Sequence, residues 1–289
     1  MFDDLRIGVV AGERVADVTG ALPELLASWP EQRMNWVIRN WAELQAQLGD
    51  LDAFPSIALD AVRLRAVNPA PPQLFAIPAN FHEHIGELAD RAITPKGKSG
   101  ADARFFLKAA GSVSGPSDGI LLPNGSLRRF DHECELGVVI GVGGANIRQE
   151  DALDHVFGYT CLIDMTMRIE KGKFEEDRSL RKSFQTFTPV GPALVTADEV
   201  PDVTALRSRL FVNDDLRQSA HLADMIVSVP EAIELISSVV ALQPGDIIAS
   251  GTPKGVGPVG IGDCVRIEID TIGAMTLAVS EAPPSPRPF

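Results

Sequence analysis

The chain has 289 residues, 45% of them apolar, so it can bury a core in one large domain with a small appendage. Its formal net charge of −13 argues against a partner that rewards a basic surface, such as nucleic acid or an anionic membrane. No stretch approaches the ~18 consecutive apolar residues of a membrane span, which leaves a small molecule as the default partner.

The N-terminus and the cysteines predict a reduced, cytoplasmic protein. Residues 1–18 start acidic, and glycine and charged residues interrupt their short apolar run, unlike a secretory signal. The cysteines, which have no metal or redox spacing, are expected to be small buried residues. They are Cys134, Cys161 and Cys264.

Residues 1–70 are predicted to form a small N-terminal α/β module. Residues 6–19 fit a short hairpin with its turn at AGE. Residues 22–49 have apolar side chains at helical spacing, interrupted at Pro30. The proline-rich VNPAPPQ then marks a boundary, and nothing before it signals catalysis.

Residues 71–283 are predicted to form the main domain, of the α+β class. Short strand-like runs separated by Gly and Pro turns dominate it, and the clearest helical pattern is at 224–242. This pattern predicts a mixed β-sheet rolled on itself with few peripheral helices. The tail at 284–289 is predicted to be disordered.

Two acids on one predicted strand need an explanation. Glu133 and Glu135 precede the apolar run GVVIGVGG, so both point to one face of the strand and Cys134 to the other. Buried like charges repel and lose hydration, so the pair needs a compensating cation or must give up a charge, unless its face is solvated. Asp164 ends another apolar strand, FGYTCLID. Three carboxylates without His or Cys would form a hard oxygen site, which suits Mg²⁺ or Mn²⁺.

Five motifs, in this order, resemble the fumarylacetoacetate hydrolase family. They are DHECELGVVIG, GYTCLIDMTMR, RKSFQTFTPVGPALVT, LFVNDDLRQ and LQPGDIIASGTPKGVGP. The resemblance covers about residues 73–280 and points to acylpyruvate hydrolase and 2-hydroxyhepta-2,4-diene-1,7-dioate isomerase-like members. It implies a mixed β-roll, a homodimer, and one Mg²⁺ or Mn²⁺ bound by Glu133, Glu135 and Asp164.

The resemblance also implies a catalytic pair in PANFHEHIGELAD. Asn80 and Phe81 fit the family's Asn-aromatic pair, and His84 and Glu87 fit the histidine and acid that follow it. On a helical turn, residues three apart are neighbours, so the carboxylate can orient the imidazole and raise its basicity. Without the resemblance these would be ordinary surface residues, which is the interpretation kept for His82.

Further residues match family positions that contact the substrate. Lys182 matches a lysine that faces the metal and developing negative charge, and Arg168 matches the arginine of a D-x-x-x-R motif. Thr252 matches the GTP threonine that contacts the substrate carboxylate. Gly251 is assigned to the same substrate-binding turn, although backbone geometry alone explains a glycine there. Lys108 in FFLK is interpreted as structural or pocket-lining.

Other positions leave the reaction open. The polar loop at 94–103 is either a plain surface loop or a lid over the substrate. The family often has Asp-x-Gln after the motif arginine, where this chain has Ile169 and Lys171, and Gln185 replaces a common Asp. The metal site is unaffected by these departures, but the identity of the reaction is less determined.

Three functions are compatible with these residues. The leading one is metal-dependent hydrolysis of a C–C bond in an acylpyruvate-type 2,4-diketo acid, with the 2-oxo acid chelated, water activated by His84 and Glu87, and Lys182 at the oxyanion. The second is an isomerase, decarboxylase or hydratase acting on a 2-oxo (di)acid of aromatic-compound catabolism. The third is a non-catalytic 2-oxo-acid-binding protein.

Overall fold

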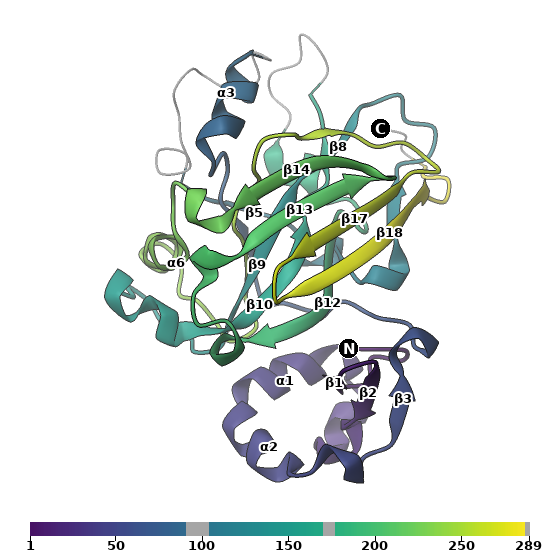
Figure 1. The fold of residues 1–289 in the computed structure, drawn as a ribbon, viewed down its shortest axis with the longest axis vertical. Helices are drawn as coiled ribbons and strands as arrows, with labels where there is room; N and C mark the ends of the chain where they lie inside the picture. Colours follow the sequence, from purple (N-terminus) through teal and green to yellow (C-terminus); the bar gives the residue numbers. More distant parts are fainter. Residues whose placement is uncertain (91–103, 170–176, 287–289) are drawn as a thin grey trace.

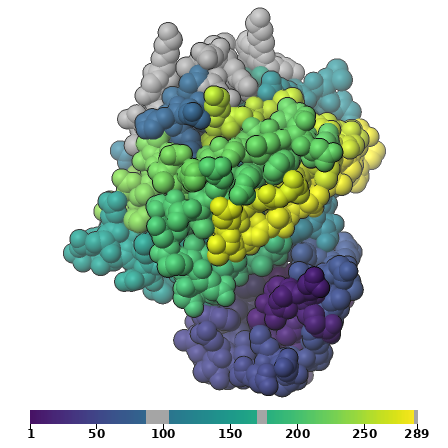
Figure 2. All heavy atoms as spheres, viewed as in Figure 1, coloured from purple at the N-terminus to yellow at the C-terminus, as the bar shows by residue number. Residues whose placement is uncertain are grey.

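The computed structural model describes residues 1–90, 104–169 and 177–286. Two facing β-sheets form the main body, and an N-terminal module forms a separate lobe against it (Figures 1 and 2). No helix within these ranges is long and apolar enough to cross a membrane.

The N-terminal module combines a small sheet with two helices. The hairpin predicted at 6–19 is present, with Gly12 at a φ of 60° in its turn, and a third strand extends it in the order β1-β2-β3. The helical region ends at Gly49, which also has a positive φ. The bounds are β1 (Gly8–Ala11), β2 (Arg14–Asp17), β3 (Ser56–Ala58), α1 (Arg33–Arg39) and α2 (Trp41–Leu48).

A seven-stranded mixed sheet lies at the centre, in the order β5-β4-β15-β9-β10-β12-β6. Most of its pairs are antiparallel, whereas β15–β4 and β12–β6 are parallel. The bounds are β4 (Leu74–Ala76), β5 (Phe106–Leu107), β6 (Val113–Ser114), β9 (Cys134–Ile140), β10 (Val156–Ile163), β12 (Thr188–Thr196) and β15 (Ile247–Ala249).

A five-stranded sheet faces the central one, in the order β14-β13-β17-β18-β7 (Figure 1). A short sheet, β11-β8-β16, lies where the first acidic strand begins. The bounds are β7 (Ile120–Leu122), β8 (Phe130–His132), β11 (Thr166–Met167), β13 (Arg207–Val212), β14 (Asp215–His221), β16 (Gly257–Pro258), β17 (Cys264–Ile269) and β18 (Gly273–Glu281). The predicted mixed sheet, curled into a roll, is confirmed.

The central strands are buried on both faces, which explains their continuous apolar runs. On one face Val138 and Ile163 pack into the core shared with the five-stranded sheet. On the other face Val139 and Leu162 pack with the N-terminal module. The central sheet is therefore held between the five-stranded sheet and the N-terminal module. The packing against the module is incomplete, since a cavity of about 580 Å³ remains between the module and β12.

Few helices accompany the sheets, as predicted. Within the described part of the main domain they are α3 (His82–Asp90), α5 (Arg178–Lys182) and α6 (Val229–Ser237). The prediction of a helix over 224–242 was too long. Ser228 and Glu231 form a capping box that starts α6. Beyond its end, Leu242 pairs with Gly144 as an isolated β-bridge, so the flanking apolar residues pack without being helical.

The cysteines have no disulfide. Cys134 and Cys161 are buried, whereas Cys264 is only half-buried, contrary to the expectation that all three are buried. Burial raises the pKa of the Cys134 thiol to about 12, so this group is a packed apolar side chain and not a nucleophile.

Asn68 ties the N-terminal module to the main body. Its side-chain nitrogen donates to Asn35 Oδ1 at 2.8 Å and to the Gly245 carbonyl at 3.0 Å, and the residue is fully buried. These bonds join segments that are 33 and 177 residues apart in the chain.

We expect Asn68→Ala to lower the free energy of unfolding by roughly 1–3 kcal/mol, because it leaves buried partners unsatisfied. Urea denaturation followed by circular dichroism measures this change. The control Gln47→Ala removes an exposed amide, and it should change stability by less than about 0.5 kcal/mol. An equally small effect for Asn68→Ala would contradict the prediction.

Candidate metal centre and active site

Three carboxylates meet where neighbouring strands begin and end. The β9–β10 register pairs Leu162 with Glu135, and the Asp164 N–H donates to the Glu133 carbonyl at 2.9 Å. Side chains alternate along a strand, so Glu133, Glu135 and Asp164 leave the same face, opposite Cys134. All three are buried, and a carboxylate oxygen from each lies within 4.8 Å of the others.

Lys182, at the end of α5, makes three hydrogen bonds within this cluster. Its Nζ lies 2.6 Å from Glu133 Oε2, 2.5 Å from Asp164 Oδ2 and 2.7 Å from Thr166 Oγ1. Burial alone would lower the pKa of Lys182, but the carboxylates of Asp164 and Glu133 raise it above its ordinary value. The ammonium is therefore a fixed positive charge at the site.

Lys108 is a second buried cation. It follows β5, forms an ion pair with Asp164 Oδ1 and donates to the Phe187 carbonyl at 3.1 Å. Burial lowers the pKa of Lys108 by more than the attraction of Asp164 raises it. The interpretation of Lys108 as structural or pocket-lining missed that it touches a candidate metal ligand.

Arg168 contacts Glu133 directly and is itself held by the buried Asp131. Its Nη2 lies 2.7 Å from Glu133 Oε1, and its Nε lies 2.7 Å from Asp131 Oδ2. Asp131 also accepts from Arg129 at 2.6 Å. Burial opposes the charge of Arg168, but Glu133 and Asp131 raise the pKa of its guanidinium. The predicted substrate-binding arginine thus contacts Glu133 directly.

The two glutamates have opposite electrostatic environments. Burial raises the pKa of Glu133, but Lys182 and Arg168 outweigh that effect and hold it well below its usual range. Burial and the repulsion of Asp164 raise the pKa of Glu135 well above its usual range, despite the attraction of Lys182. Glu135 is therefore the acid of the cluster that the neighbouring cations compensate least.

The donor set fits a hard divalent cation. Carboxylate oxygens suit Mg²⁺ or Mn²⁺, whereas zinc sites usually contain His or Cys. Within the described ranges, these acids form the one group of three or more His, Cys, Asp or Glu side chains close enough to share an ion. A cation held by Glu133, Glu135 and Asp164 would relieve the repulsion that raises the pKa of Glu135.

Gly251 and Thr252 lie on a turn beside Glu135. The Gly251 N–H donates to Glu135 Oε2 at 2.8 Å, and Thr252 is buried next to it. Gly251 has a φ of 90°, and a Cβ there would lie 2.5 Å from Asn80 Cβ, so only glycine fits. This turn therefore places a backbone donor at Glu135, the acid whose charge is least compensated.

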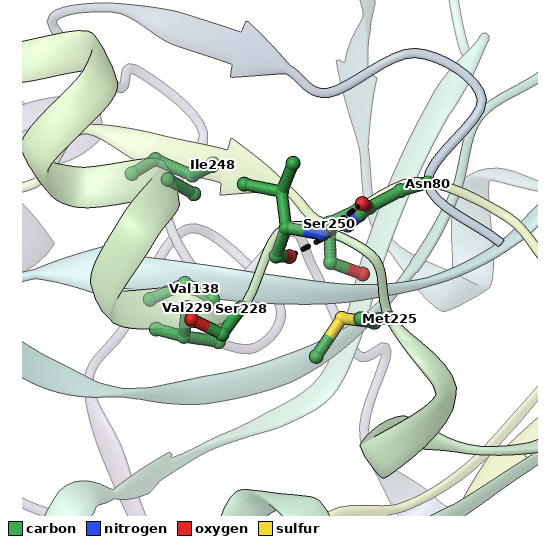
Figure 3. A pocket seen from close by; sticks show the side chains of 9 residues that line it. Asn80, Val138, Met225, Ser228, Val229, Ile248 and Ser250 are labelled. Atoms are coloured by element: carbon green, nitrogen blue, oxygen red, sulfur yellow. Dashed lines mark hydrogen bonds between the residues drawn. The ribbon is translucent and has the colours of Figure 1, made fainter. Parts of the chain in front are cut away.

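Asn80 fixes this turn relative to α3 (Figure 3). Its side-chain nitrogen donates to the Ser250 carbonyl at 2.7 Å and the Val227 carbonyl at 2.9 Å, and its Oδ1 accepts from the Val227 N–H. Only a cavity of about 10 Å³ remains beside it, room for about one water. The asparagine of the Asn-aromatic pair therefore holds backbone in place.

Helix α3 carries the predicted catalytic histidine. His84 is buried, with 4% of its surface exposed, whereas His82 is exposed. The imidazole of His84 is close enough to Glu133 to help lower that carboxyl's pKa. The side chain of Glu87 lies outside the described part of the chain, so its contact with His84 stays a prediction.

The departures from the family pattern lie partly outside the described residues. The loop at 94–103 and Lys171 both fall there. Ile169 is half-buried, and Gln185 is exposed, so the Asp-to-Gln change from the family pattern falls on the surface.

The sequence reasoning missed several residues that build the site. Lys108 was detectable as a charge that ends the apolar run FFL, and Gln218 was present in the motif LFVNDDLRQ without an assigned role. The buried Asp131 stands two residues before Glu133, on the same face of the strand path. The alternation of side chains along the strand could therefore have identified Asp131 as a further acid of the site.

We expect Glu135→Gln to stabilise the metal-free protein at pH 7 by roughly 1–3 kcal/mol, because a neutral amide avoids the cost of a buried, poorly compensated charge. The folded pKa of Glu135 is raised above its ordinary 4.5, so its carboxyl lowers stability as the pH rises through 4.5 and above. The gain should therefore shrink near pH 4. Denaturant unfolding in EDTA measures it.

Glu133→Gln is the matched control and should have the opposite sign. The pKa of Glu133 is depressed, so its charge stabilises the fold above its unfolded pKa, and neutralising it should destabilise the protein at pH 7. Added Mn²⁺ should stabilise the unmodified protein and do so much less in either variant. If both variants change the free energy of unfolding in the same direction in EDTA, the opposite electrostatic environments assigned to Glu133 and Glu135 are wrong.

Comparisons with known proteins show which family the chain and its fold belong to. The model of the fumarylacetoacetate (FAA) hydrolase C-terminal family matches residues 73–280. Maleylpyruvate hydrolase of Aquipseudomonas alcaligenes is 41% identical over 286 residues, covering 96% of this chain and 97% of that protein.

Solved structures agree with this match. The crystal structure of maleylpyruvate hydrolase from Sphingobium sp. SYK-6 in complex with manganese (II) ion and pyruvate has a TM-score of 0.85 and 40% identity, and covers 98% of both chains. The crystal structure of 2-hydroxyhepta-2,4-diene-1,7-dioate isomerase from Mycobacterium marinum has a TM-score of 0.65 and 31% identity, and covers 78% of this chain and 81% of that one. The chain therefore belongs to the fumarylacetoacetate hydrolase family.

Proposed function

We propose that this protein is a divalent-metal-dependent hydrolase that cleaves a C–C bond of an acylpyruvate-type 2,4-diketo acid. The observation that carries the proposal is the buried cluster of Glu133, Glu135 and Asp164 with Lys182 bonded into it. The chain is similar along 96% of its length to a maleylpyruvate hydrolase, and it is similar to a structure of such an enzyme with manganese and pyruvate. Both similarities support the proposed reaction.

The acids would hold the metal, and the turn would hold the substrate's carboxylate. When bound, a divalent cation polarises the 2-oxo carbonyl of a chelating acid. Thr252 follows Gly251, whose N–H holds Glu135, so its hydroxyl would contact the substrate carboxylate. The 2.7 Å contact from Arg168 keeps Glu133 oriented. Arg168 would therefore contribute to substrate binding by positioning Glu133 as a metal ligand.

His84 would act as the general base. It takes a proton from water as the hydroxide adds to the distal carbonyl, and it returns that proton to the methylene carbon when the C–C bond breaks. Glu87, three residues further along α3, would orient the imidazole. The Lys182 ammonium would stabilise the oxyanion that develops on the distal carbonyl. The products are pyruvate and a carboxylic acid.

We expect His84→Ala to lower kcat for an acylpyruvate by about 10²–10⁴-fold, because the general base is removed. The Mn²⁺ affinity measured by calorimetry should change less than about threefold, since His84 is not among the carboxylate ligands. His82→Ala, an exposed neighbour on the same helix, is the control and should keep full activity. Retained turnover in His84→Ala would exclude this residue as the base.

Removal of divalent metal should abolish turnover. After EDTA treatment and desalting we expect activity at background, and Mn²⁺ or Mg²⁺ should restore it, because the ligands are hard carboxylate oxygens. Progress curves with acylpyruvate at increasing Mg²⁺ and Mn²⁺ measure the effect. Full activity without metal would contradict a metal-dependent mechanism.

An isomerase, decarboxylase or hydratase of a 2-oxo (di)acid is the second candidate. The similarity to a 2-hydroxyhepta-2,4-diene-1,7-dioate isomerase supports it, as do Ile169 and Lys171 at positions where the family often has Asp and Gln. Product analysis separates the candidates, because only hydrolysis gives two acids without CO₂. A non-catalytic binder would show ligand-induced stabilisation without turnover on the same substrates.

Finer assignments are also part of the proposal. We propose Mg²⁺ as the ion used in the cell, a homodimer, a cytoplasmic location and a role in aromatic-compound catabolism. The family resemblance supports the dimer, and the acidic chain without metal- or redox-spaced cysteines supports the location. Sedimentation equilibrium measures the assembly.

A further inference from the structure

Gln218 is an unusual residue of the edge strand β14. It is the one fully buried side chain of that strand, at 1% exposure, while its neighbours Arg217 and Ser219 are exposed. A polar amide in this position needs partners for its oxygen and both of its N–H groups. The structure supplies all of them.

The amide joins the acidic strand to the Gly251–Thr252 turn. Its Oε1 lies 3.0 Å from the Cys134 nitrogen and 3.0 Å from His132 Nδ1, on either side of Glu133. Its Nε2 lies 2.8 Å from the Pro253 carbonyl and 2.8 Å from Thr252 Oγ1. Residues up to 86 positions away in the chain are connected by this one side chain.

Two backbone groups fix which way the amide faces. The Cys134 N–H can only donate and the Pro253 carbonyl can only accept, so a flipped amide would set donor against donor and acceptor against acceptor. The oxygen must therefore face Cys134. It follows that His132 carries a proton on Nδ1 whatever the charge of its ring, since Oε1 can only accept.

The same orientation decides what Thr252 can do. The amide nitrogen has no lone pair to accept with, so the Thr252 hydroxyl accepts one N–H and keeps its own proton for another partner. No acceptor for that proton is found among the residues that the structure describes. Thr252 is 3% exposed and follows Gly251, whose N–H holds Glu135.

We propose that Gln218 is a positioning residue that fixes Thr252 as a hydrogen-bond donor toward the carboxylate of a bound 2-oxo acid. The proposal rests on the proposed function, in which Thr252 touches that carboxylate. An oriented donor favours an anionic oxygen over an amide or ammonium group at the same place. The hydrogen bonds that direct Thr252 to the substrate carboxylate thus start at the Cys134 N–H, between Glu133 and Glu135.

The first test is Gln218→Glu with oxalate as the probe. An ionised carboxylate still accepts from Cys134 but cannot donate, so Thr252 would give its proton to the introduced carboxylate and withhold it from the ligand. We expect calorimetry at saturating Mn²⁺ to show an oxalate Kd raised about tenfold or more. The Mn²⁺ Kd should stay within about twofold. Unchanged oxalate affinity would overturn the proposal.

Two further variants separate positioning from simple damage to the fold. Asn68→Asp makes the same amide-to-acid change in another buried network, away from the site, and should leave the oxalate Kd unchanged. Gln218→Met removes the donors without adding charge and should also weaken oxalate binding. If Asn68→Asp weakens oxalate as much as the Gln218 variants, the proposal is wrong.

A double-mutant cycle with Thr252→Val gives the decisive comparison. If Gln218 acts through Thr252, Gln218→Glu should add no further loss of oxalate affinity in the Thr252→Val background. Losses that multiply, or normal oxalate binding by Thr252→Val, would overturn the proposal. The ¹⁵N spectrum of His132 must show a protonated Nδ1, and a ring protonated only on Nε2 would also overturn it.

These readouts do not depend on turnover. Hydrolysis of an acylpyruvate by the unmodified protein is assayed separately, so a non-additive cycle without hydrolysis keeps the positioning role and rejects the reaction. Hydrolysis together with an additive cycle keeps the reaction and rejects the positioning role of Gln218. If the unmodified protein does not bind oxalate with Mn²⁺, the positioning proposal is overturned, and the hydrolysis assay alone decides the proposed function.

Discussion

The repulsion among three buried carboxylates is the constraint around which the site is built. At an effective dielectric constant of ~20, two like charges ~5 Å apart repel by roughly 3 kcal/mol, a large part of a typical protein's net stability. Lys182 and Lys108 reach Asp164, and Arg168 reaches Glu133, from three different segments. Glu135 is the acid that these cations compensate least, and a bound divalent cation would relieve the repulsion it meets.

The central sheet can hold this repulsion because it is packed on both faces. The strands that end in the acids also carry Val139 and Leu162 into the core with the N-terminal module. Site and core therefore share one face of the same strands, with the acids at one end. A site on well-packed strands is held more closely than one on loops, which matters when ligand oxygens must converge within a few ångströms. The module thus supports the acidic strands although it carries no chemical group of the site.

Local patterns in the sequence predicted the parts of the site that depend on one strand. Alternation put Glu133 and Glu135 on one face and Cys134 on the other, and the strand end at Asp164 brought the third acid near. Contacts across the fold were not encoded locally. Lys108 meets Asp164 across 56 positions, and Asn80 meets Ser250 across 170. Their partners follow from sheet topology, which periodicity alone does not give. The helix at 224–242 was overestimated for a related reason, because buried apolar residues look alike in a helix and in the extended segments beside it.

Recognition and reaction are carried by different parts of the fold. The acids, the Gly251 turn and the Gln218 amide are fixed by strands and by hydrogen bonds to backbone, and together they suit the 2-oxo acid head that hydrolysis, isomerisation and decarboxylation all share. His84 comes instead from α3, a helix anchored at its start by Asn80. In the proposed mechanism the choice of reaction would therefore rest on His84 and α3, while the binding of the acid would rest on the sheet.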